Sequence, residues 1–157
     1  MRRFVTLIFA ISTMTLMAQT PINIIVGSKS FTATLADTET GEAFAALLPL
    51  SVTMNELNGN EKYHYLSSSL PTAAYQPGTI HAGDLMLYGN NCVVLFYETF
   101  NSSYSYTRIG AIDNPSGLAA ALGSGEVSVR FEFSTTTENL TPNVQSDKVP
   151  STKVLRD

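Results

Sequence analysis

Tyrosine is the residue type in this 157-residue chain whose clustering points most directly to binding chemistry. All seven tyrosines fall between residues 63 and 106. A tyrosine combines a large apolar ring with a polar hydroxyl, which suits a cleft for a peptide or a small ligand. Tyrosine is also a common strand residue that packs against cross-strand neighbours, so each has a purely structural interpretation as well. Our candidate ligand-binding tyrosines are Tyr63, Tyr65 and Tyr104.

Arg108 is the second candidate feature, because it is the only arginine between Arg3 and Arg130. A guanidinium that faces a cleft can bind a carbonyl or carboxylate group through its planar fork. The alternative is a surface ion pair with Glu56 or Glu98, worth less than about 1 kcal/mol. We therefore add Arg108 and Glu56 to the three tyrosines as candidate ligand-binding residues.

Other catalytic and metal-binding patterns do not occur in the sequence. His64 and His81 have no clustered carboxylates at ligand spacing, which argues against a zinc site. Neither a Gly-x-Ser-x-Gly nucleophile elbow nor a glycine-rich phosphate loop occurs. The single cysteine, Cys92, lies in an apolar run without basic neighbours, which predicts a buried and unreactive thiol. We therefore predict no catalytic residue, no metal site and no cofactor.

The first residues have the three parts of a secretory signal. Arg2 and Arg3 are basic, residues 4–16 are apolar, and Ala18 is a small residue for cleavage. This apolar run is shorter than the roughly twenty residues of a membrane-spanning helix. The alternative is an amphipathic first helix, but the run has no charged face. We predict a signal peptide over 1–18, export to the periplasm or the exterior, and no membrane anchor in the mature chain.

The charge balance limits the class of partner. The chain has nine lysines and arginines against thirteen acidic residues, and loss of Arg2 and Arg3 would leave the mature chain near −6. The basic residues are scattered, so the sequence argues against nucleic-acid binding. A single cysteine also excludes an intramolecular disulfide. The sequence gives no indication of the oligomeric state.

The mature chain is predicted to be mainly β. A helix is expected after Asp37 or Thr38, with Pro49 as its stop, and another from Pro115 to Gly123. The Asn58-Gly59 pair predicts a tight hairpin, and residues 67–83 predict a long loop. The last strand alternates, with Val127, Val129, Phe131 and Phe133 facing inward. The expected strands are residues 22–26, 30–35, 51–57, 62–66, 84–88, 92–100, 106–112 and 126–133.

About eight strands and two short helices favour a closed eight-stranded barrel whose ends are capped by the helices. Closure removes exposed strand edges, which otherwise invite aggregation. We assign this barrel domain to residues 19–134. Residues 135–157 are polar, contain two prolines and lack apolar periodicity, so we predict a disordered tail there.

Several short motifs stand out in the mature chain: Leu48-Pro49-Leu50, residues 56–63, Pro77-Gly78, residues 82–88 and residues 104–110. With these motifs residues 47–133 resemble the bacterial cyclophilin-like family, and the order of the elements resembles the cyclophilin barrel. Peptidyl-prolyl isomerases with this barrel have an Arg on the third strand, Phe, Met and Gln on the neighbouring strand, a further aromatic residue and a His. The third strand here has no Arg, and the chain has neither a Trp nor a His after Phe100. The resemblance therefore implies the fold but not the isomerase reaction.

Three functional hypotheses remain open from the sequence. The first is an exported, non-enzymatic module that binds a peptide or a small molecule in a groove of the barrel. The second is a weak or divergent peptidyl-prolyl isomerase whose site is built on Arg108 and the tyrosines. The third is a lipocalin-like barrel, which would hold its ligand in an open interior.

Overall fold

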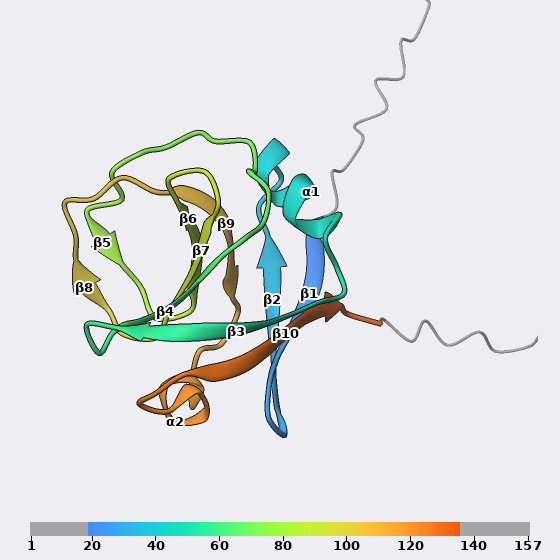
Figure 1. Cartoon of the computed structure of the whole chain (residues 1–157), viewed down its shortest axis with the longest axis vertical. Helices are drawn as coiled ribbons and strands as arrows, with labels where there is room; N and C mark the ends of the chain where they lie inside the picture. Colours follow the sequence, from blue (N-terminus) through green and yellow to red (C-terminus); the bar gives the residue numbers. More distant parts are fainter. Residues whose placement is uncertain (1–18, 136–157) are drawn as a thin grey trace, which may run out of the picture.

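The computed structural model describes residues 19–135, which form a closed barrel of eight antiparallel strands with additions outside it (Figure 1). Around the barrel the strand order is β1-β10-β3-β4-β7-β6-β9-β2. This confirms the predicted mainly β, eight-stranded barrel with two short helices. The barrel strands are β1 (Thr20–Val26), β2 (Lys29–Leu35), β3 (Leu50–Leu57), β4 (Glu61–Tyr65), β6 (Asp84–Tyr88), β7 (Cys92–Phe96), β9 (Thr107–Ile112) and β10 (Val127–Phe133).

Two sequence predictions concern the ends of the chain. The signal peptide predicted for residues 1–18 lies outside the described residues. The disordered tail predicted for residues 135–157 also lies outside them, except for residue 135.

The β3–β4 hairpin shows how local sequence fixes the register. Asn58 and Gly59 both have positive φ, 56° and 69°, as the two central residues of a type I′ turn require, and Asn60 completes a three-residue loop. The turn pairs Leu57 with Glu61 and Asn55 with Tyr63. Strand β4 therefore begins at Glu61, one residue before the predicted start. Glu61, Tyr63 and Tyr65 consequently share one face of the strand, because side chains alternate along a strand.

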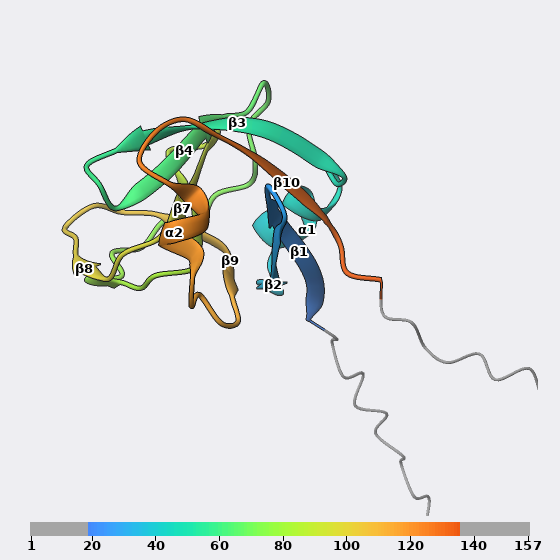
Figure 2. The ribbon, with the colours of Figure 1, turned by 90° about the horizontal axis from the view of Figure 1, so that it is seen from below.

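The two helices lie on different sides of the barrel (Figures 1 and 2). Helix α1 (Glu39–Ala45) begins after Thr38, whose Oγ1 accepts a hydrogen bond from the Gly41 amide at 3.1 Å. This confirms Thr38 as the cap. Helix α2 (Leu118–Leu122) begins three residues later than the Pro115 start that the sequence predicts. The reason is Gly117, whose φ of 82° is not helical.

Side chains fill the interior of the barrel. Apolar residues from seven of the eight barrel strands, all except β4, join Phe44 of α1 and Leu118 and Leu122 of α2 in one buried cluster. The rings of Phe44 and Phe131 meet edge to face at 5.4 Å. Such packing leaves none of the open interior that a lipocalin-like barrel needs, so that hypothesis is wrong.

A second apolar cluster lies on the outer face of the barrel. Along β6 and β7, residues on one face belong to the interior cluster, whereas Met86, Cys92, Val94 and Phe96 on the other face form the second cluster. This outer face is covered by a small sheet of β5 (Thr79–Ile80) and β8 (Phe100–Asn101). The sequence prediction missed both short strands. It was also wrong to continue one strand from 92 to 100, since β7 ends at Phe96.

The last strand corrects one further prediction. Val129 and Phe131 are buried as expected, but Phe133 is 49% exposed rather than inward and covered. Strand β10 pairs with β3 only as far as the Phe131–Leu50 pair. Phe133 extends past the end of β3 and pairs with Ile22 of β1 alone. Its side chain therefore has no covering strand on the β3 side.

Candidate functional site

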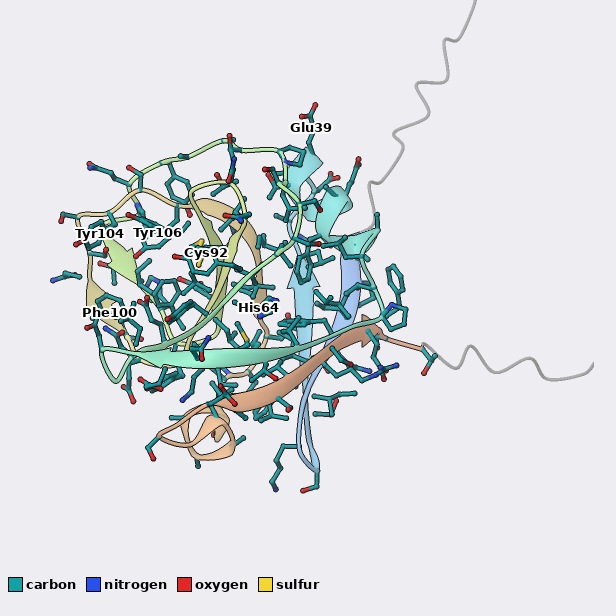
Figure 3. All side chains as sticks on the ribbon, in the orientation of Figure 1. Glu39, His64, Cys92, Phe100, Tyr104 and Tyr106 are labelled. Atoms are coloured by element: carbon teal, nitrogen blue, oxygen red, sulfur yellow. The ribbon has the colours of Figure 1, made fainter. Side chains whose placement is uncertain are left out.

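The outer apolar cluster forms the floor of a half-open pocket of about 440 Å³, which we call the tyrosine pocket. Strand β4 and its turn form one wall, β7 forms the floor, and the chain from β8 to Tyr106 forms the opposite wall. Figure 3 shows Phe100, Tyr104 and Tyr106 on the side of the barrel where β5 and β8 lie. The lining residues are Leu57, Asn58, Asn60, Glu61, Tyr63, Tyr65, Tyr88, Cys92, Val94, Phe100, Asn101, Ser102, Ser103, Tyr104 and Tyr106.

Five of the seven tyrosines line this pocket in two groups. Tyr63 and Tyr65 on β4 lie edge to face, with their ring centroids 5.9 Å apart. Tyr88, the last residue of β6, has its ring centroid 6.2 Å from that of Tyr104 and 5.8 Å from that of Tyr106, both on the opposite wall. Tyr65 and Tyr104 are more than 60% exposed, so their rings are available to a ligand. The pocket therefore offers aromatic surface from both walls.

Glu61 is a nearly buried acidic residue in the pocket wall, with 9% of its surface exposed. Burial, followed by the nearby charge of Glu56, raises the pKa of Glu61 above its ordinary value. Beside it, the Oδ1 atom of Asn60 is buried without a hydrogen-bond partner among the described residues. A buried polar atom usually has a partner, so this wall has unused capacity to accept hydrogen bonds.

Cys92 lies on the pocket floor and is 4% exposed, which confirms the predicted burial. Burial is the largest influence on the Cys92 thiol and raises its pKa, which outweighs the hydrogen bond with Tyr65. The charge of Cys92 in turn raises the pKa of Tyr65. A thiol with a raised pKa is a poor nucleophile at neutral pH. The geometry thus gives Cys92 a packing role in the pocket.

The structure places Glu56 in a different cluster, outside the tyrosine pocket. Its carboxylate binds the ammonium group of Lys62 and accepts a hydrogen bond from the Tyr97 hydroxyl at 2.7 Å. Burial opposes ionisation of Glu56, but these hydrogen bonds and the Lys62 charge prevail and lower its pKa. Lys62 is 0% exposed and also donates to the carbonyl oxygens of Gly123 and Gly125. Glu56 on β3 therefore pairs with Lys62 on β4, and Lys62 connects this cluster to the segment after α2.

Arg108 also lies away from the tyrosine pocket. Its guanidinium is half-exposed and 3.8 Å from the carboxylate of Asp84, not paired with Glu56 or Glu98. Asp84 in turn accepts a hydrogen bond from the amide of His81 at 2.9 Å. A register shift between Leu85 and Met86 brings Arg108 opposite Met86. Arg108 is thus held in an ion pair at the start of β6.

Three of the five sequence candidates, Tyr63, Tyr65 and Tyr104, therefore meet in one pocket. Glu61 and Asn60 were not among the residues predicted from the sequence. Side chains alternate between the two faces of a strand, so Glu61 lies on the same face of β4 as Tyr63. This alternation could have identified Glu61 as a candidate. Tyr88 and Tyr106 belonged to the group of seven but were not selected. No pattern in the sequence indicates the contribution of residues 100–103.

Two kinds of feature are absent from residues 19–135. Within that range no three His, Cys, Asp or Glu side chains gather in a way that could hold a metal ion. The same residues contain no helix with the length and apolar character needed to cross a membrane.

A match to a family model establishes which family this chain belongs to. The model of the cyclophilin-like family matches residues 24–132, which include all of the barrel except its ends. The chain belongs to the cyclophilin-like family. No curated protein matches the chain.

A solved structure supports this cyclophilin-like fold. It is the solution structure of the hypothetical protein AF2241 from Archaeoglobus fulgidus, which is 20% identical to this chain with a TM-score of 0.52. The alignment covers 74% of this chain and 95% of that protein. At this level of identity the similarity establishes a shared fold only. The function of this cyclophilin-like chain must therefore be argued from its own pocket.

Proposed function

We propose that this protein is an exported, non-enzymatic binding module that holds a peptide or a small molecule in the tyrosine pocket. The observation that carries the proposal is the concentration of five tyrosines around one half-open pocket of about 440 Å³. That volume is within the range of small-molecule sites, which are mostly apolar with a few polar groups. Aromatic rings supply contact area, while Glu61 and Asn60 supply polar groups that orient a ligand.

The arrangement favours binding over prolyl isomerisation. Arg108, on which a divergent isomerase site would have to be built, lies outside the pocket and is paired with Asp84. None of the residues that line the pocket is an arginine. An isomerase of this family would need a guanidinium or an equivalent donor beside the proline peptide. The described pocket provides tyrosine hydroxyls and amides instead.

Tyrosine fluorescence provides a direct test of binding, because the chain has no tryptophan to mask it. We expect a saturable change in emission when a proline-containing tetrapeptide or benzyl alcohol is titrated into the protein. Tyr104→Ala should weaken binding by about fivefold or more, since it removes an exposed ring from the pocket wall. Tyr75→Ala is the matched control, because Tyr75 is 42% exposed but does not line the pocket.

Two results would contradict the proposal. One is the absence of any saturable response to both kinds of probe. The other is a response that Tyr104→Ala and Tyr75→Ala weaken equally, which would place the binding elsewhere. A protease-coupled assay on the same tetrapeptide covers the isomerase alternative. If the protein isomerises this tetrapeptide and Arg108→Ala abolishes that activity, the protein is an enzyme and the non-enzymatic proposal is wrong.

A further inference from the structure

The tyrosine pocket has an uneven distribution of charge. Glu61 is the only Asp, Glu, Lys, Arg or His among its lining residues. The Glu61 residue is 9% exposed, so little water reaches it. The described part of the chain places no basic side chain within the pocket to neutralise this carboxyl. A buried carboxylate without a counter-ion is costly, and a cationic ligand would remove that cost.

Aromatic rings and an asparagine with an unpaired oxygen line the same pocket as Glu61. Tyr63 lies two residues along the same face of β4, and Tyr106 faces the pocket from the opposite wall. The buried Oδ1 of Asn60 has no hydrogen-bond partner among the described residues. Tyrosine rings attract cations through their negative faces, and an amide oxygen accepts hydrogen bonds from an ammonium group.

The chain itself already holds an ammonium group with the same kinds of residue. On the opposite face of β4, the Lys62 Nζ atom binds the Glu56 carboxylate and two backbone carbonyl oxygens. It also lies 5.5 Å from the centre of the Tyr97 ring. Carboxylate, tyrosine ring and amide oxygen thus form a complete ammonium site there. The tyrosine pocket has the same three kinds of group without the cation.

We propose that the ligand of the tyrosine pocket is an organic cation, with a protonated or quaternary amine that lies beside Glu61 and the tyrosine rings. This inference rests on the proposed binding function and specifies the chemical class of the ligand. The chain as a whole has a net charge of −4, which favours the approach of a cation.

The inference predicts a pH dependence that belongs to Glu61. The titratable groups that influence or are influenced by its charge are Glu56, Cys92, Tyr97 and Tyr106. The pKa of Glu56 is lowered, whereas the pKa values of Cys92, Tyr97 and Tyr106 are raised. A change in cation affinity above pH 4.5 that Glu61→Gln abolishes would therefore report ionisation of Glu61. Affinity should rise with pH, because only the carboxylate attracts the cation.

The test compares benzyltrimethylammonium, whose charge does not change with pH, with uncharged benzyl alcohol. At pH 8 we expect the cation to bind about tenfold more tightly than the alcohol. Glu61→Gln should reduce this preference to about threefold or less and should remove its pH dependence. Glu98→Gln removes the same charge from an exposed residue outside the pocket and should leave the preference unchanged. Circular dichroism of both variants checks that the barrel is folded.

Each contrary outcome has a defined meaning. Equal binding of the two probes, or a preference that Glu61→Gln leaves intact, would overturn the cation inference. If benzyl alcohol or the tetrapeptide still binds and Tyr104→Ala weakens it, the proposed binding function survives that result. If Glu61→Gln and Glu98→Gln reduce the preference for the cation equally, the preference reflects the overall charge of the protein. That result would likewise overturn the inference. Failure of every probe would reject both proposals.

Discussion

At the scale of single residues, the most unusual feature is a lysine with no exposed surface. Lys62 donates to the Glu56 carboxylate and to the carbonyl oxygens of Gly123 and Gly125. A buried charge is stable only when its hydrogen-bonding capacity is used, and here three acceptors use it. Lys62 therefore anchors the segment after α2 to strand β4.

Replacing this lysine tests the anchor. We expect Lys62→Met to lower the free energy of unfolding by about 3 kcal/mol, because two carbonyl groups and a carboxylate lose their donor. Urea denaturation measures the change. Lys29→Met is the control, since Lys29 is exposed and should change stability by less than about 0.5 kcal/mol. Equal effects of the two substitutions would contradict the anchoring role.

The two glutamates near this lysine should give stability opposite dependences on pH. The pKa of Glu56 is lowered in the folded protein, so its contribution is present above pH 4.5 and is lost as the pH falls through the folded pKa. The pKa of Glu61 is raised, so its ionisation weakens the fold as the pH rises from 4.5 through the folded pKa.

Urea denaturation of two variants across this pH range measures both effects. Glu56→Gln should be less stable than the unmodified protein at pH 7, by about 2 kcal/mol, and the difference should shrink in acid. Glu61→Gln should be more stable at pH 7, and its advantage should disappear near pH 4.5. A constant difference at every pH, for either variant, would show that the carboxyl does not titrate as described.

Residue types alone predicted part of the candidate site. Tyr63, Tyr65 and Tyr104 were selected because tyrosine suits binding surfaces, and the fold brings them into one pocket. Glu56 and Arg108 were selected as charged groups, and the fold pairs them with Lys62 and Asp84 instead. An ion pair between distant residues depends on strand pairing and register, which a single sequence does not provide.

At the scale of elements, the residues of the turns made the hairpins predictable, whereas two strands were too short to be predicted. The turn at Asn58 and Gly59 could be predicted because these two residue types adopt positive φ more readily than most others. Strands β5 and β8 have two residues each, too short for any alternation to be recognised. They pair only because the long loop after β4 and the chain after β7 meet outside the barrel. That meeting creates one wall of the pocket.

A close approach of two strands gives a prediction at the same scale. Gly110 of β9 lies against β2, and a Cβ atom there would be 2.5 Å from the carbonyl oxygen of Thr34. Since backbone cannot move aside cheaply, Gly110→Ala should destabilise the barrel by about 1–3 kcal/mol. Thermal unfolding measures this loss.

The matched control for this close approach is Gly125→Ala. A Cβ atom at Gly125 meets nothing within 4 Å, so its effect should stay within about 0.5 kcal/mol. Similar melting temperatures for the Gly110→Ala and Gly125→Ala variants would show that β2 and β9 can separate without cost.

At the scale of the whole molecule, the closed barrel could be predicted from the sequence, but the apolar cluster on its outer face could not. Eight short strands with two helices favour a closed barrel, and the alternation along β10 correctly identified Val129 and Phe131 as interior residues. The apolar runs of β6 and β7 have both faces buried, so they give no alternation to separate interior from exterior. The position of the pocket therefore required the three-dimensional structure.

The last whole-molecule prediction concerns export, which we propose on the strength of residues 1–18. A basic start, an apolar run over residues 4–16 and Ala18 are the features that a secretion machinery recognises. Expression of the full chain in a Gram-negative bacterium should yield a periplasmic protein that begins at Gln19, as determined by mass spectrometry. Ile11→Arg places a charge in the middle of the apolar run and should leave the protein uncleaved in the cytoplasm. Uncleaved, cytoplasmic protein from the unmodified sequence would refute export. Cleavage of the Ile11→Arg variant would show that the apolar run is not the signal.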